Sequence, residues 1–230
     1  MSQEKSNCDS TSIVFVMDSS GSMEEMGDEP VQGLNNFYTK QKESGDFTST
    51  LVFFNENVTF HHKNIVGKDV PILKNEEYYR GGMTALYDAI GQAIEYQKSI
   101  KIKNVIFVIL TDGLENASIK YGKKTILKMI KKMEKEHEWL FMYLGANQDS
   151  FAVSAGLGIN NSANYDYSPL GCMQAMRSIS ENVSRCVSHD LKPAQINSEC
   201  LKIKEDEKEK TNKRILNSPI PSLRPKKLRF

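Results

Sequence analysis

The sequence has no long apolar segment and no recognisable export signal. Its uninterrupted apolar runs are no longer than that of residues 105–110, whereas a helix that crosses a bilayer needs about 20 apolar residues. Residues 1–12 are polar and lack the apolar stretch and the small-residue cleavage site of a secretory signal. We therefore expect no membrane span and a cytoplasmic location.

Cysteine is scarce, and the glycine motifs that bind phosphate are missing. The four cysteines are scattered along the chain, without a CxxC pair or histidines at zinc-ligand spacing, which favours free thiols over a zinc site. No GxxxxGKS/T or GxGxxG run stands at a predicted strand-to-helix turn. The sequence thus gives no support to zinc-binding, phosphate-loop or dinucleotide-binding functions.

Length and charge indicate one domain with unlike ends. A chain of 230 residues with 39% apolar and 26% charged residues is typical of a single α/β domain with a buried core. The net charge is +1, but residues 201–230 hold ten Lys/Arg against four Asp/Glu. We predict a flexible amino terminus over residues 1–11, a folded domain over 12–188, and a disordered tail, mixed in charge and then basic, over 189–230.

Strand-like and helix-like segments alternate along the domain, which indicates a parallel sheet with helices on both faces. Compact apolar runs predict strands over residues 13–17, 48–54, 58–62, 105–110, 139–144 and 163–167. Apolar stripes predict helices over residues 31–42, 84–97, 123–137, 149–156 and 169–187, and residues 63–83 are predicted to be loop. The expected fold is a three-layer, doubly wound, Rossmann-like α/β domain with a mostly parallel six-stranded sheet, in which 58–62 is the antiparallel edge strand.

Three polar segments follow predicted strands or begin a predicted helix. Residues 18–22 come directly after the first strand, and residues 111–113 come after the most apolar strand. Between them, Thr84 stands at a predicted helix start after a Gly-Gly pair. Each segment alone is more readily a turn or a helix cap. In a doubly wound sheet, however, loops at the carboxyl ends of adjacent central strands meet in one crevice, so we expect the three segments to converge.

The same segments resemble a known family. DSSGSM, GGMTALYDAI and ILTDG are similar to the three loops of the metal-ion-dependent adhesion site in von Willebrand factor A domains, and the resemblance covers residues 12–188. The later stretch ANQDSFAVSAGLGI resembles microbial and phage-type stand-alone members. The resemblance implies one metal site formed by the side chains of Asp18, Ser20, Ser22, Thr84 and Asp112.

The donor types of these five residues independently favour a hard divalent ion. Hydroxyl and carboxylate oxygens, without imidazole or thiolate, suit Mg²⁺, Mn²⁺ or Ca²⁺ better than zinc or copper. Because several donors are neutral, the ion keeps much of its positive charge and attracts a carboxylate from outside. We therefore predict metal-dependent protein–protein recognition, in which a monomer of this protein captures an Asp or Glu side chain of a protein partner.

Two other functions compete with metal-dependent recognition. The basic residues 201–230 are compatible with a nucleic-acid-associated factor, whose binding would weaken steeply with salt. The second alternative is a metal-dependent hydrolase. It would need a base or nucleophile beside the ion, and no histidine lies in any of the three loops. We therefore predict that the protein is not an enzyme.

Two further groups of residues are interpreted as surface features. His61 and His62 lie on the predicted edge strand, where adjacent side chains point to opposite faces and cannot easily bind one ion together. Four acidic residues follow the first loop and are expected to form the rim of the crevice: Glu24, Glu25, Asp28 and Glu29. Such a rim is either a solvated approach to the next helix or a surface that repels anions and attracts a basic partner.

Overall fold

A six-stranded sheet forms the middle layer of the protein, in the order β3-β2-β1-β4-β5-β6. The structure is a computed structural model that describes residues 10–146 and 149–196. Neighbouring strands run parallel except for β3, which pairs antiparallel with β2 at the sheet edge. The strands are β1 (Thr11–Asp18), β2 (Phe47–Phe54), β3 (Val58–Val66), β4 (Asn104–Thr111), β5 (Leu140–Ala146) and β6 (Asn161–Tyr165). The predicted fold class is confirmed.

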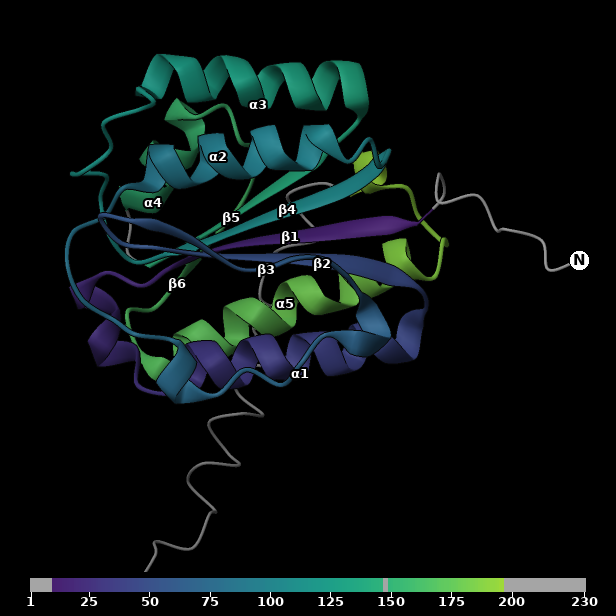
Figure 1. Cartoon of the computed structure of the whole chain (residues 1–230), viewed down its shortest axis with the longest axis horizontal. Coiled ribbons are helices and arrows are strands. Elements are labelled where there is room, and N and C mark those ends of the chain that lie inside the picture. The colour runs from purple at the N-terminus through teal and green to yellow at the C-terminus, as the bar shows by residue number, and fades with distance from the viewer. Residues whose placement is uncertain (1–9, 147–148, 197–230) are drawn as a thin grey trace, which may run out of the picture.

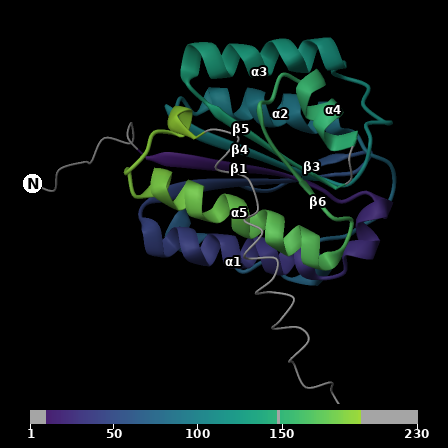
Figure 2. The same cartoon turned by 180° about the vertical axis from the view of Figure 1, so that it is seen from behind.

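Helices cover both faces of this sheet, as Figures 1 and 2 show from opposite sides. One face carries α1 and α5, and the other carries α2, α3 and α4. The helices are α1 (Glu29–Ser44), α2 (Leu86–Ser99), α3 (Lys123–His137), α4 (Asp149–Gly156) and α5 (Pro169–Val187). No helix in the described part of the chain has the length and apolar character needed to cross a membrane.

The central strands are buried on both faces, which is why their sequences are apolar without alternation. In β1, Ile13, Phe15 and Met17 belong to the core under α1 and α5. Val14 and Val16 belong to the core under α2 and α3. All eight residues of β1 are buried, so the strand's carboxyl end, where Asp18 lies, is held firmly from both sides.

Several boundaries differ from the prediction. Strand β3 continues through residues 63–66, which were predicted to be loop, and β6 begins and ends two residues earlier than predicted. Helix α2 begins at Leu86, two residues later than predicted, and Ala85 is its N-cap residue. Short 3-10 helices were not predicted: η1 (Gly21–Met26), η2 (Gly67–Asp69), η3 (Asn75–Glu77) and η4 (Pro193–Gln195).

The ends of the described fold reach beyond residues 12–188. Thr11 already belongs to β1, and Ile196 packs with the core under α5 at 5% exposure. Most of the predicted amino-terminal segment and of the predicted tail lies outside the described residues. Of the four cysteines, Cys172 and Cys186 are described, and both are buried free thiols.

A β-bulge in β3 changes the placement of the two adjacent histidines. Val52 pairs with Phe60 and Leu51 pairs with His62, so His61 is an extra residue in its strand. The His61 ring lies 5.3 Å from Phe53 and the His62 ring 6.2 Å from Tyr38, both on the α1/α5 side. His62 is only 8% exposed. The prediction that the two side chains point to opposite faces was wrong, because the bulge shifts the alternation by one residue. His62 is also not the surface group that was predicted, whereas His61 is half-buried.

Candidate metal centre

The five residues predicted to bind metal lie together at the carboxyl edge of the sheet. Asp18 ends β1 and Asp112 follows β4, and these two strands are neighbours. A methyl group placed on Gly113 would lie 3.1 Å from Thr84 Oγ1, 3.6 Å from Ser22 Oγ and 3.7 Å from Asp18 Oδ2. Oxygens of the first and second loops therefore surround a small space in front of Gly113, which belongs to the third loop.

Hydrogen bonds connect the remaining members of the cluster. The Ser20 and Ser22 hydroxyl oxygens are 3.1 Å apart. Ser22 Oγ donates to Asp112 Oδ1 at 2.7 Å, and the Ser20 amide donates to Asp18 Oδ1 at 2.8 Å. These contacts hold one serine beside each carboxylate, so the two acids and their hydroxyl neighbours form a single polar group at the loop junction.

Both carboxylates are buried, and burial is the main influence on their acidity. It raises the pKa of Asp18 to about 6, although hydrogen bonds from Thr111 and Ser20 act in the opposite direction. The negative charge of Asp112 also raises the Asp18 pKa. Burial likewise raises the pKa of Asp112, with the Ser22 hydrogen bond opposing it. Among the described residues neither acid has a Lys or Arg salt-bridge partner, so a bound cation would relieve an uncompensated charge.

One carboxylate oxygen has no hydrogen-bond partner. Asp112 Oδ2 is buried and unpartnered within the described structure. The Tyr167 hydroxyl lies 2.8 Å from the Ser22 carbonyl oxygen and is also close enough to Asp112 to lower the pKa of that carboxyl. A buried carboxylate oxygen without a donor is costly unless a ligand satisfies it. The site therefore offers an unsatisfied carboxylate oxygen in the same cluster as the Ser20 and Ser22 hydroxyls, and such oxygen donors are what a hard cation requires.

Backbone hydrogen bonds fix the first loop against the second. The Gly21 amide donates to the Gly82 carbonyl at 3.2 Å, and the Gly81 amide donates to the Ser19 carbonyl at 2.9 Å. Gly82 has a φ of 78°, and a β-carbon there would overlap the Glu56 carboxylate. Glycine at position 82 is thus favoured by its backbone conformation, whereas the Glu56 carboxylate is the end of an exposed side chain that can move.

The second loop is fixed in turn against the third. The Thr84 amide donates to Asn116 Oδ1 at 2.8 Å, and the Asn116 amide donates back to the Thr84 carbonyl at 3.0 Å. The prediction that Thr84 begins the helix was wrong by two residues, since α2 starts at Leu86. Its hydroxyl therefore has no capping role and faces the space in front of Gly113.

Two carboxylates that the sequence did not identify hold the third loop on α2. Asp88 is 5% exposed and accepts hydrogen bonds from the amides of residues 119–121. Glu115 accepts from the Tyr87 amide at 2.9 Å and from the Ser118 amide at 2.7 Å. Asp88 stands on the buried side of α2 among apolar residues, and this unusual placement was the signal in the sequence that could have identified it.

The rim of the candidate centre is both acidic and apolar. Glu24 and Glu25 are exposed, and the charge of Glu25 contributes to the raised pKa of Asp112. Met83 and Leu114 belong to the second and third loops and are 55% and 60% exposed. Among the described residues, no group of three or more His, Cys, Asp or Glu side chains is arranged to hold a metal ion. Any ion at this centre would therefore depend on hydroxyl donors as well as on the two carboxylates.

Comparison with known proteins gives structural similarity without sequence similarity. No protein-family model matches the chain, and no curated protein matches it. The minor pilin PilB from Streptococcus sanguinis aligns over 77% of this chain and 62% of its own, with a TM-score of 0.58 and 13% identity. A von Willebrand factor type A structure from Catenulispora acidiphila aligns over 77% of this chain and 43% of that one, with a TM-score of 0.53 and 11% identity.

A third similar structure is the ArnB paralog VWA2 from Sulfolobus acidocaldarius. It aligns over 73% of this chain and 44% of its own, with a TM-score of 0.52 and 14% identity. The chain thus spans less than two thirds of each of these three proteins, and identities at this level establish the fold alone. The described domain has a von Willebrand factor A-like α/β fold.

Proposed function

We propose that the protein is a divalent-metal-dependent recognition module with a centre of the metal-ion-dependent adhesion type. Asp18, Ser20, Ser22, Thr84 and Asp112 would hold Mg²⁺, with Mn²⁺ or Ca²⁺ as substitutes, and a partner's Asp or Glu side chain would complete the shell. The observation that carries the proposal is the buried, unpartnered Asp112 Oδ2 of the third loop, in one cluster with hydroxyl and carboxylate oxygens of the first and second loops. The similar structures, which include two von Willebrand factor A domains and a minor pilin, are consistent with protein–protein recognition in general.

The composition of the centre explains why an external acid would bind. Three of the five proposed ligands are neutral hydroxyls, and the two carboxylates at most balance the +2 charge of the ion. An external acid would therefore bind by filling a coordination position that these five residues leave open. The metal supplies a local positive charge that attracts one further oxygen anion. The protein's own residues position that charge at the carboxyl edge of the sheet, where the exposed Met83 and Leu114 provide apolar contacts for the partner.

The acidic rim narrows the choice of partner. Glu24 and Glu25 stand beside the centre and would repel an entirely acidic surface. A partner that presents one acid among basic or apolar residues satisfies both the ion and the rim. Recognition of this kind would discriminate against nonspecific polyanions, because those meet the rim before they reach the centre.

Recognition suits this arrangement better than catalysis. The described hydrogen bonds of the cluster join serine, threonine, tyrosine and aspartate side chains, and none involves a histidine. The Ser20 and Ser22 hydroxyls lead only to Asp112, which we assign to the ion. A serine nucleophile would need a free general base, so we propose that the centre binds without turnover.

Metal binding is tested first, with the whole chain and no partner. Mn²⁺ titration followed by electron paramagnetic resonance should show one site in the unaltered protein and none of comparable affinity in Asp112→Asn, which keeps the size of the side chain. Glu136→Gln removes a carboxylate on the exposed side of α3 and should leave the titration unchanged. Equal binding by the unaltered protein and by Asp112→Asn would remove the basis of the proposal.

Partner recognition is tested in a second experiment. Immobilised protein is incubated with cell extract in Mg²⁺ and in chelator, and Asp112→Asn is used as matched bait. We expect partners that bind the unaltered protein in Mg²⁺ and are lost in the other conditions. Peptides from an identified partner, with its acidic residue changed to the amide, should then bind at least about tenfold more weakly. Capture that is unaffected by chelator and by the variant would contradict metal dependence.

A further inference from the structure

A second site lies at the opposite edge of the sheet, where β1 and β4 begin. A cavity of about 1020 Å³ opens there, and we call it the amino-edge pocket. Its walls come from the ends of α2, α3 and α5 and from the starts of β1 and β4. The eight residues of β1 separate it from the candidate metal centre by roughly 25 Å, so the two sites share no residue.

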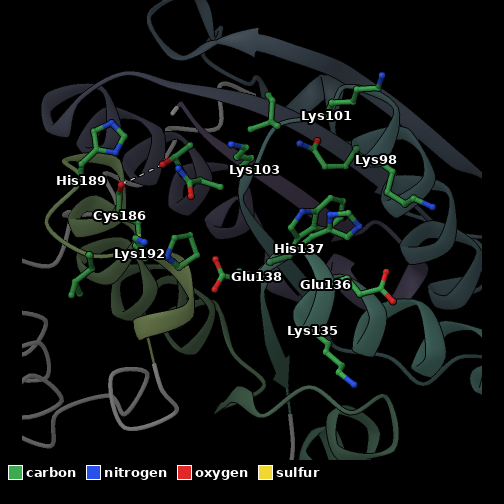
Figure 3. A pocket seen from close by; sticks show the side chains of 17 residues that line it. Lys98, Lys101, Lys103, Lys135, Glu136, His137, Glu138, Cys186, His189 and Lys192 are labelled. Atoms are coloured by element: carbon green, nitrogen blue, oxygen red, sulfur yellow. Dashed lines mark hydrogen bonds between the residues drawn. The ribbon is translucent and has the colours of Figure 1, made fainter. Parts of the chain in front are cut away.

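Positive charge gathers around this pocket from separate elements. Five lysines line it, as Figure 3 shows: Lys98, Lys101, Lys103, Lys135 and Lys192. They belong to α2 and the loop after it, to α3, and to the segment after α5. None of the five has a salt-bridge partner among the described residues. The lysines come from three parts of the chain, so the charge surrounds the pocket and does not belong to one helix face, although the ends of Lys98, Lys101 and Lys135 point outward in Figure 3.

Two acids in the lining moderate this charge without cancelling it. Glu136 is already engaged with Lys132, which lies outside the pocket lining, at 3.7 Å. Glu138 is exposed at the end of α3 and lies between His137 and the Lys192 side of the pocket. The lining thus combines a clear excess of cations with one carboxylate that can accept a hydrogen bond. That combination suits an anionic ligand which also carries hydrogen-bond donors.

The pocket also contains an unsatisfied amide. Gln97 lines the cavity at 0% exposure, and neither its oxygen nor its nitrogen has a hydrogen-bond partner in the described structure. A buried side-chain amide without partners is rare. It presents one donor and one acceptor side by side, which is the pattern that a glutamine uses to pair with the edge of a nucleobase. Trp139, 5% exposed, adds an aromatic surface to the same lining.

We propose that the amino-edge pocket binds a nucleotide. The lysines would contact the phosphates, and Gln97 would hydrogen bond to the base edge. A cavity of about 1020 Å³ lies at the upper end of the size range of small-molecule sites, roughly 300–1,000 Å³, and accommodates a ligand of this size. The proposed contacts are separate lysines and a glutamine, so nucleotide binding here would not need the glycine-rich phosphate loop that the sequence lacks.

The tryptophan provides a direct measurement. Trp139 is the only tryptophan of the chain, so its fluorescence reports on this pocket alone. ADP is titrated into the whole protein in the presence of chelator, which keeps the candidate metal centre out of the experiment. We expect a saturable change in emission, and inorganic pyrophosphate at the same concentration should bind at least about tenfold more weakly because it has no base.

Matched variants separate a built site from general electrostatic attraction. Lys101→Gln with Lys103→Gln should weaken ADP binding roughly tenfold or more, whereas Lys124→Gln with Lys128→Gln removes the same charge from exposed positions of α3 outside the pocket lining and should change it little. Gln97→Met should weaken ADP binding and leave pyrophosphate binding unchanged. Circular dichroism and thermal melting verify that each variant is folded.

Three results would overturn the nucleotide proposal. ADP and pyrophosphate binding equally well would show that the base is not recognised, and an unaltered ADP affinity in Gln97→Met would show that water satisfies this amide. A short single-stranded RNA that binds more tightly than ADP would assign the lysines to nucleic acid. These outcomes are independent of the metal centre, because all measurements are made in chelator.

Discussion

Gly113 provides the space in which the oxygens of the candidate centre meet. A β-carbon at this position would lie 3.1 Å from Thr84 Oγ1 and close to Ser22 Oγ and Asp18 Oδ2. The backbone conformation of Gly113 is one that alanine adopts readily, so Gly113→Ala should fold. We expect Mn²⁺ affinity to fall roughly tenfold or more, because the methyl group occupies the place of the ion or displaces its ligands. Electron paramagnetic resonance titration measures the change.

Gly122→Ala is the matched control for this substitution. A β-carbon at Gly122 would meet nothing within 4 Å, and the residue precedes α3, away from the five proposed ligands. Its Mn²⁺ affinity should equal that of the unaltered protein. Undiminished Mn²⁺ binding by Gly113→Ala would show that the ion, if it binds, sits elsewhere.

His62 makes stability depend on pH. Burial lowers its pKa to about 4, and the neighbouring His61 contributes in the same direction. Its Nε2 lies 3.0 Å from Ser49 Oγ, whereas Nδ1 is buried without a partner, so a second proton would have no acceptor. The unfolded chain takes up this proton below the usual histidine pKa of about 6.5, and the folded protein does not. Stability should therefore decrease as the pH falls from about 6.5 to about 4, by an amount on the order of 3 kcal/mol.

Urea denaturation at a series of pH values measures this dependence. In His62→Gln the side chain can still donate to Ser49 but does not titrate, so the decrease over this pH range should become smaller. His137→Gln changes an exposed histidine at the other edge of the sheet and should leave the slope as it is. An identical slope in His62→Gln and in the unaltered protein would show that other groups cause the pH dependence.

At the scale of elements, the loop between β4 and α3 is held in place by the first turn of α2. Asp88 accepts the amides of Ile119, Lys120 and Tyr121. The substitution Asp88→Asn would turn one acceptor oxygen into a donor that faces these amides. We expect a loss of about 1–3 kcal/mol of folding free energy and faster hydrogen exchange over residues 115–121, measured by mass spectrometry.

The same change should weaken metal binding indirectly, since Asn116 in this loop fixes the backbone of Thr84. Glu136→Gln serves as control, because its carboxylate lies on the exposed side of α3. Faster exchange without any loss of Mn²⁺ affinity would separate the stability of the loop from the arrangement of the centre.

The type of each element could be predicted more reliably than its ends. Residues 105–110 are six consecutive apolar residues rich in β-branched side chains, and such a run between helical segments is typical of a strand covered on both faces. The bulge at His61, in contrast, arises from how β3 pairs with β2, and one strand's sequence does not contain that information. The start of α2 was misplaced for a similar reason, since Thr84 is held by hydrogen bonds to Asn116 in another loop.

At the scale of the whole molecule, topology determines which sites the sequence reveals. The candidate metal centre could be predicted because parallel neighbouring strands bring their carboxyl ends together, so three short motifs were sufficient. The residues that support it act through hydrogen bonds between loops and were not recognised: Asn116 lies outside the three motifs, and Thr111 lies within ILTDG but was given no role. The amino-edge pocket could not be predicted, because its lysines stand at the ends of different helices and gather only when the layers pack.

A metal bound at the carboxyl edge should stabilise the entire fold, because its proposed ligands come from loops that follow β1, precede α2 and follow β4. An ion that binds only the folded state at 100 times its dissociation constant adds about 2.7 kcal/mol. For a domain of this size that corresponds to a rise in Tm of roughly 5–10 °C. Differential scanning calorimetry in Mg²⁺ and in chelator measures it. Asp112→Asn should show no rise, whereas Lys101→Gln with Lys103→Gln should show the full rise, since the amino-edge pocket contributes no ligand. A rise that persists in Asp112→Asn would locate the stabilising ion outside the three loops.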